Sequence, residues 1–184
     1  MTDILSAVYD YVLKYACDVS NDINPYTENQ IVRGWQNSAT LPPNTNEFCI
    51  ITDLTTSAHG TTPEFFDSDN VCQLQRTIEH VIQLDFLSSE DITLPQTTLR
   101  RATAIQTVSN TNFATDFFQT FDSSLTCLYA DGVTNLSELD ESKTYSTRYQ
   151  VQLHLAEIFT TTISADTFSN VDLHLENVDV HHKI

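Results

Sequence analysis

The sequence predicts an α+β domain, a mostly antiparallel β-sheet with two or three helices packed on one face. Residues 2–17 place apolar side chains at three- and four-residue steps, as an amphipathic helix does. Residues 77–86 and 145–163 alternate polar and apolar side chains, as half-buried strands do. The later strands are joined by short connectors, which favours antiparallel pairing. At 184 residues, we expect one domain covering 1–184.

The first half of the chain contains one helix and two strands. Thr2 or Asp3 can cap the helix over 2–17, and a loop with Pro25 follows. We expect a strand over 48–55, a loop over 58–70 and a strand that begins at 77 or as early as 71. The inward face of this second strand carries Ile78, His80, Ile82, Leu84 and Phe86.

The second half begins with helices and ends with strands. Pro95 opens a predicted helix whose inner side carries Leu99, Ala102, Ile105 and Val108. Asn112 can cap a short helix that contains Phe113, Phe117, Phe118 and Phe121. Strands are predicted over 125–130, 145–163 and 171–180. We expect an exposed acidic loop near 131–144, with its acidic stretch over 135–143, and a short polar tail over 181–184.

The net charge of the chain limits the kinds of partner that it can bind. The chain has 8 basic and 25 acidic residues, giving a formal charge of −17, so it should repel DNA and anionic membranes. Such charge also keeps a protein soluble. Cys17, Cys49, Cys72 and Cys127 are scattered and no secretory signal is evident, so we expect free thiols inside a cell. No apolar run is long enough to cross a bilayer.

The sequence contains no recognisable catalytic or metal-binding pattern. The histidines lack ligand spacing, no nucleophile motif occurs, and three glycines hardly suffice for a phosphate loop. Paired carboxylates lie in predicted loops, where acid-base catalysis is not expected. We therefore expect neither an enzyme nor a bound cofactor or metal.

The most informative segment is residues 31–37, Ile-Val-Arg-Gly-Trp-Gln-Asn, followed by Pro42 and Pro43. It contains the only Trp and one of three glycines. Trp35 has two interpretations that the sequence leaves open. It can plug one end of the core, as large aromatic residues often do, or face another subunit. The second interpretation makes Arg33, Trp35, Gln36 and Asn37 candidate interface residues.

These segments resemble the neck-terminator and tail-terminator proteins of tailed phages. The resemblance rests on the N-terminal helix, on Arg33, Gln36, Asn37, Pro42 and Pro43 before an apolar strand, and on the strands near 77–88 and 147–159. Asn44 to Glu47 before the first strand, and Ser88-Ser89 where relatives tend to have Gly, depart from the family pattern.

The resemblance implies a structural virion protein that forms a ring, commonly a hexamer. Such a ring caps the tail tube, ends its polymerisation and joins it to the head-tail connector in the neck. The expected partners are further copies of the chain, the tube protein, connector proteins and, in contractile tails, the sheath. Assembly would take place in the host cytoplasm, and DNA would pass through without specific binding.

The acidic loop has two interpretations. Asp131, Glu138, Asp140 and Glu141 could line the lumen or contact another ring, or they could form a solvated outer surface. Other functions also stay open: another head-tail joining, tail-completion or decoration protein, a monomeric binding module, or a diverged hydrolase.

Overall fold

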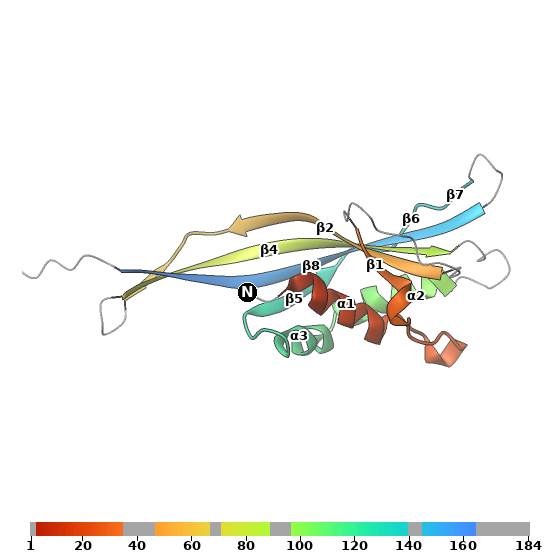
Figure 1. Ribbon diagram of the computed structural model, residues 1–184, viewed down its shortest axis with the longest axis horizontal. Helices are drawn as coiled ribbons and strands as arrows, with labels where there is room; N and C mark the ends of the chain where they lie inside the picture. The colour runs from red at the N-terminus through yellow and green to blue at the C-terminus, as the bar shows by residue number, and fades with distance from the viewer. Residues whose placement is uncertain (1–2, 35–46, 67–70, 89–96, 140–144, 165–184) are drawn as a thin grey trace, which may run out of the picture.

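The computed structural model describes residues 3–34, 47–66, 71–88, 97–139 and 145–164 (Figure 1). Its helices are α1 (Ile4–Tyr15), α2 (Thr97–Ser109) and α3 (Asn112–Gln119). Its strands are β1 (Ile31–Arg33), β2 (Glu47–His59), β3 (Glu64–Phe66), β4 (Val71–Ser88), β5 (Leu125–Ala130), β6 (Thr134–Asn135), β7 (Glu138–Leu139) and β8 (Tyr145–Ser164). Short 3₁₀ turns occupy Val19–Asn21 and Glu28–Gln30.

The sheet has the order β1-β2-β4-β8-β5. Pairing is antiparallel throughout, except that β1 runs parallel to β2. The pair β4–β8 keeps one register from Val71 opposite Ser164 to Ser88 opposite Thr147. At about 3.3 Å per residue, 18 paired residues span roughly 60 Å, so this pair forms the spine of the molecule. The predicted α+β architecture is confirmed.

All three helices lie on one face of the sheet (Figure 1). Alternation along β4 and β8 directs Ile82, Leu84, Val151 and Leu153 toward them, and all four side chains are buried. The helices contribute buried side chains of their own to the same core, namely Ala7, Val8, Tyr11, Val12, Ala102, Ile105, Ala114 and Phe118.

Local signals fix the start of α1 and its contact with α2. The Asp3 side chain accepts a hydrogen bond from the Leu5 N–H at 3.1 Å, so Asp3 is the N-cap. The buried hydroxyls of Tyr11 and Ser109 lie 2.9 Å apart and join α1 to the end of α2. Burial raises the pKa of Tyr11, because the phenolate would lose its solvation.

Gly34 is required by a close approach between β1 and β2. Its N–H donates to the Ile51 carbonyl at 2.7 Å. A Cβ on Gly34 would overlap the Thr52 hydroxyl oxygen and lie 3.3 Å from the Ile51 carbonyl oxygen. A larger residue at this position therefore forces the Thr52 side chain, or β2 itself, to shift.

The sheet extends well beyond the helices (Figure 1). We call this extension the arm. It consists of β3 with residues 55–59 of β2, 71–78 of β4 and 158–164 of β8. In the described part of the chain, β1 pairs only with residues 49–51 of β2, and β5 only with residues 153–157 of β8. Both outer edges of the arm therefore lack a neighbouring strand there.

The structure corrects several local predictions. Residues 58–70 contain the end of β2 and all of β3, and the acidic stretch from 135 contains β7 and the end of β6. Leu99 is only half-buried, whereas Arg101 is buried. Thr111, not Asn112, is the N-cap of α3. The predicted strand over 171–180 and the tail lie outside the described residues.

Candidate functional site

The sheet face away from the helices carries a charged cluster. Glu79 Oε1 lies 2.7 Å from His154 Nδ1, and Glu79 Oε2 lies 2.7 Å from His59 Nε2. His154 Nε2 lies 3.5 Å from an Asp131 carboxylate oxygen. The Tyr129 ring stacks on the His154 ring with centroids 4.3 Å apart. Two acidic and two imidazole side chains thus join β2, β4, β8 and the residue after β5.

The hydrogen bonds in this cluster favour the ionised form of the Glu79 carboxylate. The hydrogen bond from His154 lowers the pKa of Glu79 below its ordinary value of 4.5, and the bond from His59 acts in the same direction. In the described residues, no group of three or more His, Cys, Asp or Glu side chains has a metal-binding arrangement. The cluster therefore supplies a polar surface that links strands.

A second ion pair lies on the helix-side face, at the base of the arm. His80 Nε2 and Glu157 Oε2 are 3.2 Å apart, and both side chains are about nine-tenths buried. The Thr56 hydroxyl lies 3.3 Å from His80 Nδ1, so both ring nitrogens have polar contacts. This pair marks the boundary between the apolar core and the arm.

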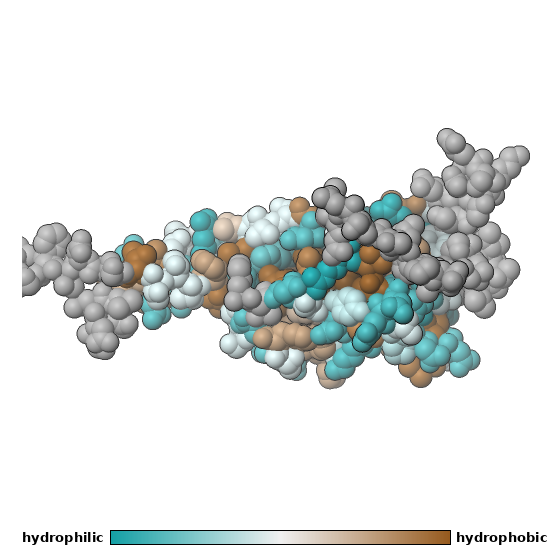
Figure 2. Space-filling view, in the orientation of Figure 1, coloured by the Kyte–Doolittle hydropathy of each residue, from teal (hydrophilic) through white to brown (hydrophobic). Residues whose placement is uncertain are grey.

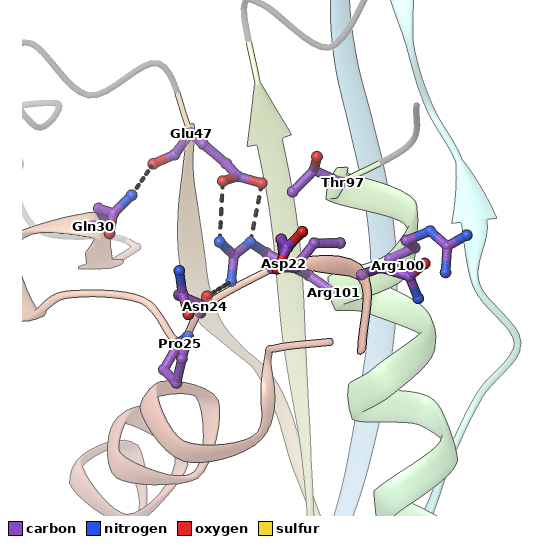
Figure 3. A pocket seen from close by; sticks show the side chains of 10 residues that line it. Asp22, Asn24, Pro25, Gln30, Glu47, Thr97, Arg100 and Arg101 are labelled. Carbon is purple, nitrogen blue, oxygen red and sulfur yellow. Dashed lines mark hydrogen bonds and ion pairs between the residues drawn. The ribbon is translucent and has the colours of Figure 1, made fainter. Parts of the chain in front are cut away.

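Arg101 occupies the floor of a pocket of about 500 Å³ between α2, β2 and the loop that follows α1 (Figure 3). Its guanidinium binds the Glu47 carboxylate at 3.0 and 3.2 Å and the backbone carbonyls of Ala16 and Asn24 at 2.5 and 2.7 Å. It also lies over the Tyr26 ring, 4.0 Å from the centroid. These contacts occupy the charge, so Arg101 ties three segments together and is not available to an anionic ligand.

The arm exposes hydrophobic side chains that a soluble monomer would normally bury. On Phe65, Phe66, Phe159 and Ile163 the exposed fraction is 51%, 61%, 39% and 49%. Figure 2 shows hydrophobic surface along the extension and at its end. Contiguous exposed apolar surface marks interaction sites, and open strand edges can pair with another chain. The arm is thus the strongest candidate for an assembly surface.

Few of the predicted site residues fall within the described chain. Arg33 on β1 binds Asp3 at 2.9 Å and the Ser6 hydroxyl at 2.7 Å, which anchors β1 to the start of α1. Asp131 contacts His154, as described above, and is exposed. Glu138 lies in β7, opposite Ser146 of β8. Trp35, Gln36, Asn37, Asp140 and Glu141 lie outside the described residues.

Sequence reasoning missed the arm and the Glu79 cluster. Alternation already placed Glu79 and His154 on polar faces of their strands, but only the register of β4 with β8 brings them together. The arm was hidden because Thr, Ser and Ala at 55–58 resemble a loop in composition. The adjacent apolar pairs Phe65-Phe66 and Ile158-Phe159 are local signals for exposed apolar surface, because a strand directs neighbouring side chains to opposite faces.

These features define a class of protein: a small α+β assembly subunit with an open sheet and an apolar extension. The model of the phage neck terminator protein family matches residues 2–181 of the 184, and the chain belongs to that family. It is therefore a structural protein of the phage virion, located in the neck or tail, where it interacts with other phage head or tail proteins.

No curated protein matches the chain significantly. Among the described helices, none has the length and apolarity that a membrane span requires.

Proposed function

We propose that the protein forms a closed ring, hexameric by the family resemblance, that caps the tail tube. The ring ends tube polymerisation and presents its other side to the head-tail connector and, in a contractile tail, to the sheath. The observation that supports this proposal is the arm, whose edges have no neighbouring strand among the described residues and whose Phe and Ile side chains are exposed, as at a protein-protein contact. The family membership supports the location.

The physical basis of termination is a difference between the two sides of the ring. A subunit whose one face matches the end of the tube, and whose other face does not, adds once and then blocks further addition. A ring requires heterologous contacts between neighbours, in which two different patches of each copy meet. An open sheet with an apolar arm at one end provides such an asymmetric subunit.

The experiment that tests this proposal is removal of the gene from the phage. We expect tubes of uneven and excessive length and heads that lack tails, both visible by electron microscopy. Supplying the protein in trans should restore tails of uniform length. Uniform, head-attached tails in its absence would contradict the proposal.

Copy number separates a terminator from the alternative neck roles. A terminator ring contributes a few copies to each particle, whereas a decoration protein is abundant. Quantitative mass spectrometry of purified virions, with the tube protein as internal standard, measures this ratio. Equal abundance with the tube or head protein would favour decoration.

We also propose that acidic residues of 131–141 face the lumen or a neighbouring ring. Each copy has a formal charge of −17, so carboxylates on the bore would repel passing DNA. Changing Glu138, Asp140 and Glu141 to Lys should leave ring formation intact and slow DNA ejection. A triple variant with normal ejection would place these residues on the outer wall.

A further inference from the structure

The helix-side face of the arm carries an apolar stripe around one basic residue. Strand register places Phe66 opposite Cys72, Cys72 opposite Ile163, and Arg76 opposite Phe159. Cys72 and Arg76 have the same parity along β4 as the core residues Ile82 and Leu84, so the stripe continues the face that α1 to α3 cover in the body. Along the arm, none of the described helices lies over that face (Figure 1).

Among the residues that the structure describes, Arg76 has no partner of opposite charge. It is exposed, and no carboxylate in the described part of the chain lies within ion-pair distance. By contrast, Arg33, Arg100, Arg101 and Arg148 each pair with an acidic side chain. In a chain with three times as many acidic as basic residues, an unpaired Arg among exposed Phe and Ile side chains is suited to an acidic, partly apolar partner.

The outward face of α3 has the complementary chemistry. Phe113 has 71% of its surface exposed, although it is apolar. Asp116 lies one helical turn further along on the same face and is exposed, without an ion pair in the described structure. The opposite side of α3 packs on β5 and α2 through Ala114 and Phe118. This helix therefore presents one aromatic and one acidic group outward.

We infer that the arm of one copy docks on α3 of the neighbouring copy, with Arg76 pairing with Asp116 and Phe159 and Ile163 packing on Phe113. A helix of the neighbour then covers the sheet face that the molecule's own helices leave open. The two patches lie on different parts of one chain, so the arm of each copy can dock on α3 of the next, and such a heterologous contact repeats around a ring. This inference rests on the proposed ring, and specifies which surfaces close it.

Charge exchange tests the ion pair. Arg76→Glu and Asp116→Arg should each weaken self-association of the purified protein about tenfold or more, measured by analytical ultracentrifugation over a concentration series. The double variant Arg76→Glu/Asp116→Arg should regain association within a few-fold of wild type. Asp10→Arg, a matched reversal on the exposed side of α1, should have little effect. A double variant as weak as the single variants would overturn the pairing.

Disulfide cross-linking in purified phage particles tests the geometry without requiring rings to form in isolation. A chain with both Phe113→Cys and Phe159→Cys should produce, on oxidation, a ladder of covalent oligomers up to the full ring. In a Cys17→Ser background, each single variant should remain monomeric, because the inferred contact brings position 113 next to position 159 and not two copies of either. Dimers from Phe159→Cys alone would indicate arm-to-arm contact, and the absence of a ladder would exclude the arm-α3 contact; either result overturns the inference.

These outcomes are independent of the proposed function. If the cross-link fails while gene deletion still gives overlong tails, the protein is a terminator whose ring closes through other surfaces. If gene deletion leaves tails normal, the proposed function fails, whatever the cross-linking result.

Discussion

Glu79 and His154 lie diagonally across β4 and β8, with Glu79 Oε1 2.7 Å from His154 Nδ1. The other oxygen of the same carboxylate is 2.7 Å from His59 Nε2 on β2. One acidic side chain thus links three adjacent strands where the sheet leaves the body and becomes the arm. The link adds side-chain contacts to the backbone pairing at the base of the arm, beyond which none of the described helices packs on the sheet.

The first prediction concerns pH. Because the folded-state pKa of Glu79 lies below its ordinary value of 4.5, its contribution to stability is present above about pH 4.5 and is lost as the pH falls through the folded-state pKa. Glu79→Gln should therefore lower the free energy of unfolding at neutral pH, and its difference from wild type should shrink in acid. Urea denaturation from about pH 7 to pH 3 measures this difference. Glu64→Gln, on exposed β3, is the control; a Glu79→Gln difference that grows in acid would contradict the prediction.

The second prediction compares two adjacent arginines. Arg101 is buried and binds Glu47 and two backbone carbonyls, so Arg101→Met should cost about 3 kcal/mol or more by leaving Glu47 and those carbonyls unpaired. Arg100 pairs with Asp18 at 3.0 Å near the surface, where solvent screens the charges, so Arg100→Met should cost far less than Arg101→Met. Chemical denaturation measures both changes. Equal losses would show that the Arg101 contacts add no special stability.

The third prediction concerns Gly34, where β1 comes close to β2. Gly34→Ala should destabilise the protein by about 1–3 kcal/mol, because the new methyl group overlaps the Thr52 hydroxyl. Thr52→Ala removes that oxygen, so Gly34→Ala should cost less in a Thr52→Ala background. A double-mutant cycle from thermal or urea unfolding gives the coupling free energy between the two substitutions. If the two effects are additive, β1 moves away from β2 and the new methyl group does not press on the Thr52 hydroxyl.

The spine of the fold could be predicted because β4 and β8 alternate over long stretches. Their inward residues, such as Leu84 and Leu153, follow directly from the period of two. The full length of β2 could not be predicted in this way, since residues 53–56 are all exposed and leave no alternation. The pairing with β4, not the local pattern, extends that strand to His59.

The residues of the candidate site were harder to predict from the sequence than the fold. Arg101 resembles a solvated helix residue in the sequence, and its partners Glu47, Ala16 and Asn24 are 54 to 85 positions away. The interface assigned to Arg33, Trp35, Gln36 and Asn37 stays a prediction, as does the acidic lumen. Of these four residues, the structure describes only Arg33, which has partners within its own chain.

The last prediction separates the buried and exposed phenylalanines of α3. The sequence pattern suggested that Phe113, Phe117, Phe118 and Phe121 share one helix, and an apolar residue at most positions cannot reveal which side is inward. Phe118 is fully buried, 4.9 Å from the Tyr11 ring, so Phe118→Ala should cost about 3–5 kcal/mol in unfolding free energy. Phe113→Ala should change the stability of the monomer by less than about 0.5 kcal/mol, because the side chain is mostly in solvent.

Both variants can be measured by urea denaturation at a concentration low enough to keep the protein monomeric, and by ultracentrifugation at high concentration. Phe113→Ala should then weaken association while leaving the unfolding midpoint unchanged, since its apolar surface stabilises only a contact between copies. Phe118→Ala should lower the unfolding midpoint and leave association unchanged, at temperatures where the variant stays folded. A Phe113→Ala variant that unfolds as easily as Phe118→Ala would mean that Phe113 belongs to the core and that α3 presents a different face outward.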